Sequence, residues 1–219
     1  MYRDASGKTL VDYPRPSVAV DTAVLTVRPD RTLELLLVRR SEIGDWALPG
    51  TFLHERETLA DAVLRSLADK AGLGGAAPRQ LHVFDALDRD DRGWVLSVAH
   101  VVVLPWAEVE RVLQARSDDV CVRPVADATG LPFDHDAIVA MAVDVVRAAY
   151  ADRPDPEGLL VEPFTMRQLR HLHEAVGGRR LVPDSFRRQV LPHLVDTGRT
   201  AEGVVGRPAA LYRRGPAPL

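Results

Sequence analysis

The sequence predicts an α/β body followed by a small helical module that ends in a β-hairpin. In the first part of the chain, β-branched and apolar runs of strand length alternate with stretches of helical periodicity. The segment 151–163 then carries three prolines and one glycine between two helical patterns, which is typical of a domain boundary. Two amphipathic stretches and an extended return follow it. We therefore expect one domain over residues 1–155 and a second over residues 156–219.

The composition is that of a globular protein. Hydrophobic residues make up 46% of the 219 residues and charged residues 27%. Cys121 is the single cysteine, which excludes an internal disulfide and a cysteine-based zinc site and suits a reducing cytoplasm, where we expect the protein to be found. No apolar run is long enough to cross a bilayer, so we expect no membrane partner.

Charge is distributed unevenly along the chain. Residues 164–219 hold 10 arginines against 4 acidic residues, a net charge of +6, whereas residues 1–163 carry a net charge of −9. A basic end on an acidic body indicates contact with a polyanion such as nucleic acid. The alternative is a solvated basic face.

The expected strands of the body are apolar or β-branched runs bounded by turn residues. They lie at 17–27, 33–39, 46–48, 80–88, 94–105 and 120–125. Short helical patterns are found at 107–115 and 134–150. The apolar face expected for 134–150 consists of Ile138, Met141, Ala142, Val145 and Ala149. We interpret His135 as a helix-start residue without a ligand role.

The stretch 46–73 organises the body as strand, loop, helix and stop. Pro49 and Gly50 break an apolar run. Thr58 stands where a helix N-cap belongs, because its hydroxyl can accept a bond from an otherwise unpaired backbone N–H. Gly72 can adopt the left-handed conformation that ends a helix.

This stretch resembles the Nudix box. Glu57, Arg65, Leu67, Gly72 and Leu73 keep the spacing of that pattern, whereas Thr51 replaces its first glycine. The core, which in the family reads Arg-Glu-apolar-any-Glu-Glu, reads Arg65-Ser66-Leu67-Ala68-Asp69-Lys70 here. The alternative is an ordinary amphipathic helix after a Pro-Gly turn.

The resemblance implies the Nudix fold, an α/β/α sandwich with a mixed sheet. Nudix hydrolases hold Mg²⁺ or Mn²⁺ against a diphosphate with these glutamates, and hard cations prefer carboxylate oxygens. Ser66 is a weak neutral ligand, and Lys70 introduces an ammonium. We therefore expect no catalytic residue, no bound metal and no cofactor. What the family resemblance implies instead is ADP-ribose or a related nucleotide as an effector.

The residues expected to bind this effector are arginines at a strand end together with charged residues of the box. Arg39 and Arg40 close the second strand beside the box, where either side chain could bind a phosphate through two hydrogen bonds. The alternative for these two is a surface arginine pair. The full set is Arg39, Arg40, Glu57, Arg65, Asp69 and Lys70.

The C-terminal module has the plan of a winged helix-turn-helix. Thr165 is the expected N-cap of a helix over 166–176, and Asp184 that of a second helix over 185–193. A loop and an extended segment at 207–213 follow as the wing. The second helix could enter the major groove, where arginine reads guanine. The alternative is an accessory dimerisation module.

A Nudix-like domain with an altered box, followed by a winged helix, resembles the Nudix-related transcriptional regulators, bacterial repressors of NAD biosynthesis and salvage. The matching segments are Tyr13-Pro14-Arg15-Pro16, Trp46-Ala47-Leu48-Pro49-Gly50, Phe133-Asp134-His135, Phe164-Thr165-Met166-Arg167-Gln168-Leu169, Phe186-Arg187-Arg188 and Gly206-Arg207-Pro208-Ala209-Ala210-Leu211-Tyr212. The resemblance implies a homodimer that binds a palindromic operator in double-stranded DNA and releases it when ADP-ribose binds.

The DNA-binding residues follow from this resemblance and from position. Phe186 is expected to anchor the second helix, and Arg199 is placed in the wing only by its position in the loop. The expected set is Phe186, Arg187, Arg188, Gln189, Arg199 and Arg207. Two other functions remain open: an active hydrolase of ADP-ribose-type dinucleotides with a C-terminal dimerisation domain, and a DNA-binding protein whose body is only a scaffold.

Overall fold

The body is built on one mixed β-sheet. The computed structural model describes residues 3–30, 32–40, 45–201 and 208–216. Within these ranges the sheet has the strands β1 (Ser17–Val27), β2 (Leu33–Arg39), β3 (Trp46–Ala47), β4 (Gly50–Phe52), β5 (Arg79–Phe84), β6 (Val95–Val103) and β7 (Val120–Pro124). Its order is β3-β2-β1-β6-β5, with β4 also paired to β1 and β7 to β2. The central pair, β1 and β6, runs parallel, which explains why both strands are almost continuously apolar.

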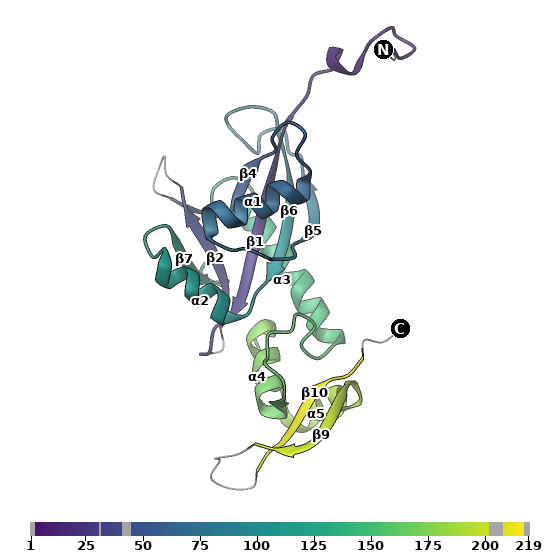
Figure 1. Cartoon of the computed structure of the whole chain (residues 1–219). Coiled ribbons are helices and arrows are strands. Elements are labelled where there is room, and N and C mark those ends of the chain that lie inside the picture. The colour runs from purple at the N-terminus through teal and green to yellow at the C-terminus, as the bar shows by residue number, and fades with distance from the viewer. Residues whose placement is uncertain (1–2, 31, 41–44, 202–207, 217–219) are drawn as a thin grey trace.

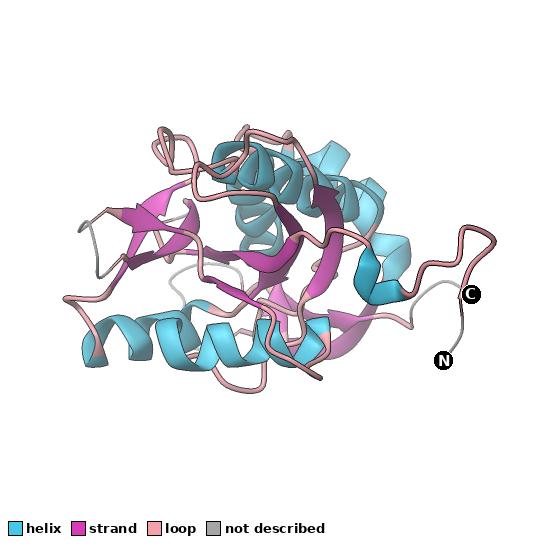
Figure 2. Cartoon of the chain, turned by 90° about the horizontal axis from the view of Figure 1, so that it is seen from above, coloured by secondary structure: helices cyan, strands magenta, loops and turns pink. Residues whose placement is uncertain are grey.

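Helices cover both faces of this sheet (Figures 1 and 2). On one face, α1 (Leu59–Ala71) and α2 (Trp106–Ala115) bury Val63, Leu67 and Val109 against the strands. On the other face, α3 (His135–Asp152) buries Ile138 and Val146. This arrangement confirms the α/β/α sandwich with a mixed sheet that the sequence predicts.

Helix α1 begins and ends where its local sequence predicts. The Thr58 hydroxyl accepts a hydrogen bond from the Asp61 N–H at 3.2 Å, and the Asp61 carboxylate accepts one in return from the Thr58 N–H at 3.3 Å. Gly72 has φ of 65° and donates its N–H to the last turn. Side-chain capping at one end and left-handed glycine at the other therefore fix the length of the helix.

The C-terminal module is a winged helix. It consists of β8 (Phe164–Thr165), α4 (Met166–Gly177), α5 (Pro183–Val190), the 3₁₀ turn η2 (Leu191–His193), β9 (Leu194–Thr200) and β10 (Ala210–Arg214). The three strands form a separate antiparallel sheet of order β8-β10-β9. Its core contains Phe164, Leu169, Phe186, Val190 and Tyr212.

The winged helix is docked onto the body through α4. Leu172 and Val176 belong to the same buried cluster as α3 and the central strands. Arg147 of α3 also donates from Nε to the Val176 carbonyl at 3.0 Å. The two parts of the chain therefore share an apolar cluster.

Three details of the winged helix differ from the prediction. Helix α5 begins at Pro183 and Asp184 does not cap it, because Pro183 fits the first helical position with its fixed φ and lack of an N–H. The helix also ends at Val190, three residues earlier than expected, and the chain continues as η2, which contains Pro192. Strand β9 continues to Thr200, so residues 197–200 belong to a strand, whereas the sequence predicts a loop over residues 197–206.

The apolar face of α3 is also rotated from the prediction. Ile138 and Ala142 are buried as expected, but Val145 is 41% exposed, whereas Val139 and Val146 are buried. The cause is that α3 packs against both the sheet and α4, so its buried stripe is wider than a single-face pattern indicates. Strand β5 ends at Phe84, before the end of the strand predicted at 80–88. Strand β6 spans Val95–Val103, slightly less than the strand predicted at 94–105.

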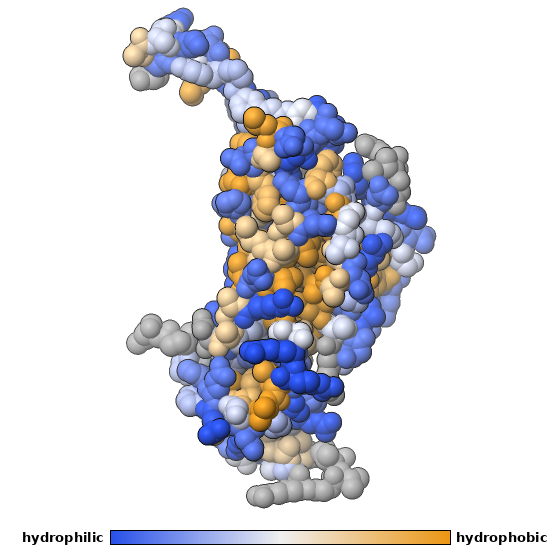
Figure 3. All heavy atoms as spheres, turned by 180° about the vertical axis from the view of Figure 1, so that it is seen from behind, coloured by the Kyte–Doolittle hydropathy of each residue, from blue (hydrophilic) through white to orange (hydrophobic). Residues whose placement is uncertain are grey.

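The surface of the molecule is divided by polarity. On the face seen in Figure 3, apolar residues gather over the middle of the body, whereas strongly hydrophilic residues surround a small apolar patch in the C-terminal module. In the part of the chain that the structure describes, no helix is long and apolar enough to cross a membrane.

Candidate functional site

A pocket of about 410 Å³ opens beside the Nudix-like loop and helix. It is formed where β1, the end of β2, β4 and the C-terminal half of α1 meet the loop before β6 and the start of α3. Its charged lining residues are Asp21, Arg39, Arg40, Asp69, Lys70, Arg89, Asp90, Arg92, Arg116 and Asp119. Phe52, Phe133 and His135 add aromatic surface.

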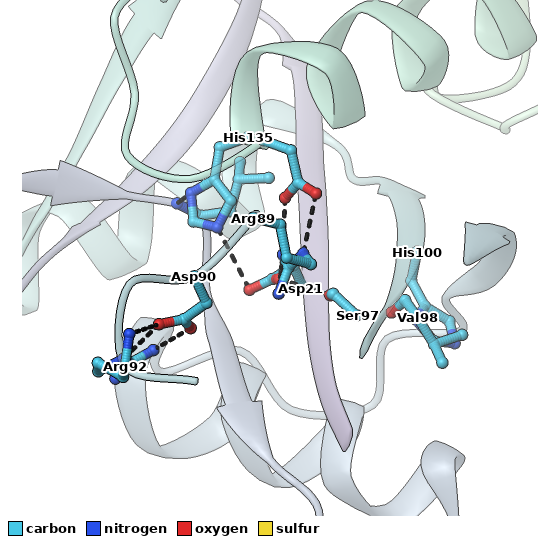
Figure 4. A network of polar contacts seen from close by, with 10 residues as sticks. Asp21, Arg89, Asp90, Arg92, Ser97, Val98, His100 and His135 are labelled. Carbon is cyan, nitrogen blue, oxygen red and sulfur yellow. Dashed lines mark hydrogen bonds and ion pairs between the residues drawn. The ribbon is translucent and has the colours of Figure 1, made fainter. Parts of the chain in front are cut away.

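A buried polar network forms one wall of this pocket (Figure 4). Asp21, in the middle of β1, is 8% exposed and accepts a hydrogen bond from Ser97 Oγ at 2.6 Å. Arg89 lies 3.6 Å from Asp21 and donates two hydrogen bonds to Asp134, at 2.9 and 2.6 Å. The network therefore ties β1, β6, the loop before β6 and the start of α3 together.

The carboxyl of Asp21 is held in its ionised form. Burial raises its pKa, but the contact with His135, the hydrogen bond from Ser97 and the positive charge of Arg89 outweigh burial, so the pKa lies below its ordinary value. The negative charge of Asp21 is thus already balanced by groups of the protein.

His135 is the first residue of α3, as the sequence predicts, and it is also part of this wall. It is 2% exposed, and its Nδ1 accepts a hydrogen bond from the Leu48 N–H at 3.2 Å. Because Nδ1 is an acceptor, the ring proton lies on Nε2, 3.4 Å from Asp21 Oδ1. His135 therefore connects the Nudix-like loop to the pocket wall.

The mouth of the pocket is cationic. The Arg40 guanidinium lies 5.0 Å from the centre of the Phe133 ring, and that of Arg39 lies 5.8 Å from the Trp46 ring. The Lys70 ammonium donates a hydrogen bond to the Gly50 carbonyl. Burial and the neighbouring arginines lower the pKa of Lys70, whereas Asp21 raises it. Such a concentration of positive charge suits an anionic ligand.

Four of the six residues expected to bind the effector lie together in this pocket: Arg39, Arg40, Asp69 and Lys70. Glu57 and Arg65 do not line it. They pair with each other, with Nε to Oε1 at 2.7 Å and Nη2 to Oε2 at 2.8 Å, and Arg65 also donates to Thr51 Oγ1 and the Phe52 carbonyl. This pair therefore braces β4 and lies outside the lining of the pocket.

The pocket also contains residues that were not expected there. Asp21, Arg89, Arg92, Arg116 and His135 come from four separate segments of the chain, with Arg89 and Arg92 in the same loop before β6. One signal for Asp21 exists in the sequence, because it is the single charged residue in the run S-V-A-V-D-T-A-V-L-T-V. His135 lies in the matching segment Phe133-Asp134-His135, whereas the three arginines have no comparable local signal.

The residues expected to bind DNA do not all lie on one accessible surface. Arg187 and Arg188 are exposed on α5, and Arg199 is exposed on β9. Phe186 is only 4% exposed, so it holds α5 in place and cannot itself contact a base. Gln189 is exposed, but its Nε2 donates to the Ala151 carbonyl at the end of α3 at 3.2 Å. Arg207 lies outside the described residues.

The fold and the pocket define a Nudix domain joined to a winged helix. The family model of the NUDIX domain matches residues 18–141, and that of the NrtR DNA-binding winged helix domain matches residues 157–214. The chain belongs to the Nudix-related transcriptional regulators of the NrtR type.

Two relatives match this chain over most of its length. An ADPR responsive transcriptional repressor, NtrR, of Acinetobacter baylyi is 28% identical over 92% of this chain and 83% of its own length. The crystal structure of Shewanella oneidensis NrtR complexed with a 27mer DNA is 34% identical, covers 90% of this chain and 93% of that one, and has a TM-score of 0.76.

A third similar structure covers the body alone. The NUDIX domain of Shewanella oneidensis NrtR, complexed with ADP ribose, is 28% identical over 64% of this chain and 95% of that chain, with a TM-score of 0.54.

Proposed function

We propose that this chain is a transcriptional repressor that binds operator DNA through its winged helix and releases it when the Nudix-like body binds ADP-ribose or a related nucleotide. One observation carries the proposal: both domains align together, over 90% of this chain, with a relative captured on DNA. The cationic pocket of the body supports a phosphate-containing effector.

The proposal extends to the assembly and the regulated genes. We expect a homodimer on a palindromic site, since two copies related by a twofold axis read two equivalent half-sites. The genes expected near such sites are those of NAD biosynthesis or salvage. The protein would act in the cytoplasm.

Catalysis is not part of the proposed function. Ser66 and Lys70 stand where the Nudix box has glutamates. A repressor that hydrolysed its own signal would also remove that signal. If wild-type protein cleaved ADP-ribose in the presence of Mg²⁺, and Glu57→Gln abolished the cleavage, the alternative of an active hydrolase would be correct.

Fluorescence anisotropy tests the repressor directly. The probes are DNA segments upstream of the gene for this chain and of neighbouring NAD-metabolism genes, titrated with and without ADP-ribose at fixed salt, because phosphate contacts make the affinity salt-dependent. We expect sequence-dependent binding that ADP-ribose weakens. Tight binding that ignores ADP-ribose would keep the repressor and reject this effector, and absence of specific binding would reject the repressor.

A further inference from the structure

Among the described residues, the four aspartates that line the pocket are not grouped as ligands for a divalent cation. Mg²⁺ is held by carboxylate and carbonyl oxygens in near-octahedral geometry. Ser66, which replaces one glutamate of the Nudix box, is 1% exposed and does not line the pocket. Within the described ranges, no three His, Cys, Asp or Glu side chains are grouped so that they could hold a metal ion.

Two carboxylates of this region, Glu57 beside the pocket and Asp21 in its wall, are already paired with groups of the protein. Both oxygens of Glu57 accept from Arg65, and Oε2 also accepts from the His54 N–H at 2.8 Å. These bonds, first of all those from Arg65, lower the pKa of Glu57 to about 2. Asp21 lies between Arg89 and His135. Neither carboxylate therefore has the open coordination side that a metal requires.

Lys70 places a positive charge in the lining of the pocket, where phosphates of a ligand could bind. Its ammonium reaches from α1 to the Gly50 carbonyl on β4, across the mouth of the pocket. Gly50 itself must be glycine, because a Cβ there would meet Asp21 and would lie 2.9 Å from the Val20 carbonyl. A positive charge is thus held at a backbone oxygen and next to the carboxylate wall.

The choice of lysine is unusual in this chain. Of the 28 basic residues, 26 are arginines, and the two lysines are Lys8 and Lys70. Lysine presents a compact, strongly hydrated point charge, whereas arginine presents a planar fork. Among basic side chains, an ammonium is therefore the closer substitute for a metal ion.

We infer that the Lys70 ammonium takes the place of the divalent cation of Nudix hydrolases, so that this pocket binds a diphosphate-containing nucleotide without metal. Lys70 neutralises charge between the Gly50 carbonyl and the ligand phosphates, while Arg39, Arg40 and Arg116 at the mouth contribute further positive charge. The inference takes the identity of the nucleotide from the proposed function. The metal-free site itself is argued from the pocket alone.

Isothermal titration calorimetry of the full chain tests it, with ADP-ribose and with inorganic pyrophosphate, each in excess EDTA and in Mg²⁺. We expect wild-type protein to bind equally in both buffers. Lys70→Met should bind roughly tenfold to a hundredfold more weakly, since hydrogen bonds to charged groups are worth that much. Lys70→Glu should bind more weakly than Lys70→Met in both buffers, because a carboxylate at this position repels the phosphates of the ligand.

Lys8→Met is the matched control, because it removes the other lysine, which is exposed and lies 5.2 Å from the Tyr13 ring in the N-terminal segment. It should bind as wild type does. Thermal unfolding of each variant checks folding, and since Lys70 lies at the surface of α1 we expect unchanged midpoints.

The outcomes separate the two proposals. Binding by wild type only in Mg²⁺, or binding by Lys70→Met that equals wild type, would reject the role of Lys70 and leave the repressor intact. Pyrophosphate binding in EDTA that depends on Lys70, without ADP-ribose binding, would support the role of Lys70 and reject the proposed effector. If wild type bound neither ligand in either buffer, both the metal-free site and the effector would be wrong.

Discussion

At the scale of single residues, the exposed arginines of α5 carry the expected DNA contact. Arg187 and Arg188 follow the buried Phe186, so the same helical turn that fixes α5 in the core turns two guanidinium groups outward. Part of the positive charge of the module is therefore concentrated on the exposed side of α5. Specific contacts of this kind are the ones that mutation can remove.

Replacing both Arg187 and Arg188 by alanine should lower operator affinity by several kcal/mol, if each contributes roughly 1–3 kcal/mol. Anisotropy titrations at one salt concentration measure the loss. Arg111→Ala is the control, because this arginine lies on α2 in the body, bonded to the Ala107 carbonyl at 3.3 Å. Unchanged operator affinity in the double variant would place the reading surface elsewhere in the chain.

The sequence predicts single residues well where their role is local. The N-caps Thr58 and Thr165 and the C-cap Gly72 depend on neighbours within a few positions, and all three are found as predicted. Asp21 and Ser97 are 76 residues apart, and Leu48 and His135 are 87 apart. Only the sheet topology brings these groups together, so no spacing rule could have revealed the pocket wall.

At the scale of elements, the segment between α3 and β8 is an anchored connection, although its composition is that of a linker. Asp155 is fully buried and accepts hydrogen bonds from the Leu159 and Leu160 N–H groups, at 2.8 and 2.9 Å, and from Tyr150 Oη at 3.0 Å. Arg214 of β10 pairs with the same carboxylate at 2.5 Å. The last strand of the winged helix is therefore tied to the end of α3.

Asp155→Ala should lower the free energy of unfolding by about 3 kcal/mol, because a buried charge pair loses one partner. Urea unfolding followed by circular dichroism measures this. Glu157→Ala is a matched control in the same segment, since its ion pair with Arg79, at 2.7 Å, is more exposed and should contribute about 0–1 kcal/mol. Equal losses in the two variants would show that Asp155 does not anchor the segment.

The sequence could not distinguish this anchored connection from a flexible one. Prolines and glycine mark where helix and strand stop, and they do so here: α3 ends at Asp152 and β8 begins at Phe164. What rigidifies the segment is Arg214, which lies 59 residues from Asp155. The boundary itself remains a prediction, whereas the anchoring is visible only in three dimensions.

At the scale of the whole molecule, the body and the winged helix meet at a buried histidine. His173 of α4 is 9% exposed and packs edge-to-face against Tyr150 of α3, at 5.1 Å, and against Phe186 of α5, at 4.9 Å. Any rearrangement of α4 against α3 must disturb these rings. The histidine thus lies on the physical connection between the Nudix domain and α5.

The stability of this arrangement should depend on pH through His173. Burial lowers its pKa from 6.5 to about 4, with Asp155 acting in the opposite direction. Between these two values the unfolded chain binds a proton that the folded chain excludes, so stability is greatest above pH 6.5 and falls as the pH falls toward 4. One pKa unit corresponds to about 1.4 kcal/mol, so acidification to about pH 5 should remove roughly 2 kcal/mol.

Urea unfolding at about pH 7 and about pH 5 tests this, with wild type compared to His173→Leu. The variant lacks the titrating group, so its loss on acidification should be smaller than that of wild type by the same roughly 2 kcal/mol. His82→Leu, which removes an exposed histidine of β5, should behave as wild type does. If His173→Leu kept the full pH dependence, the proton uptake would belong to other groups, and the contact between the two domains would not sense pH through this residue.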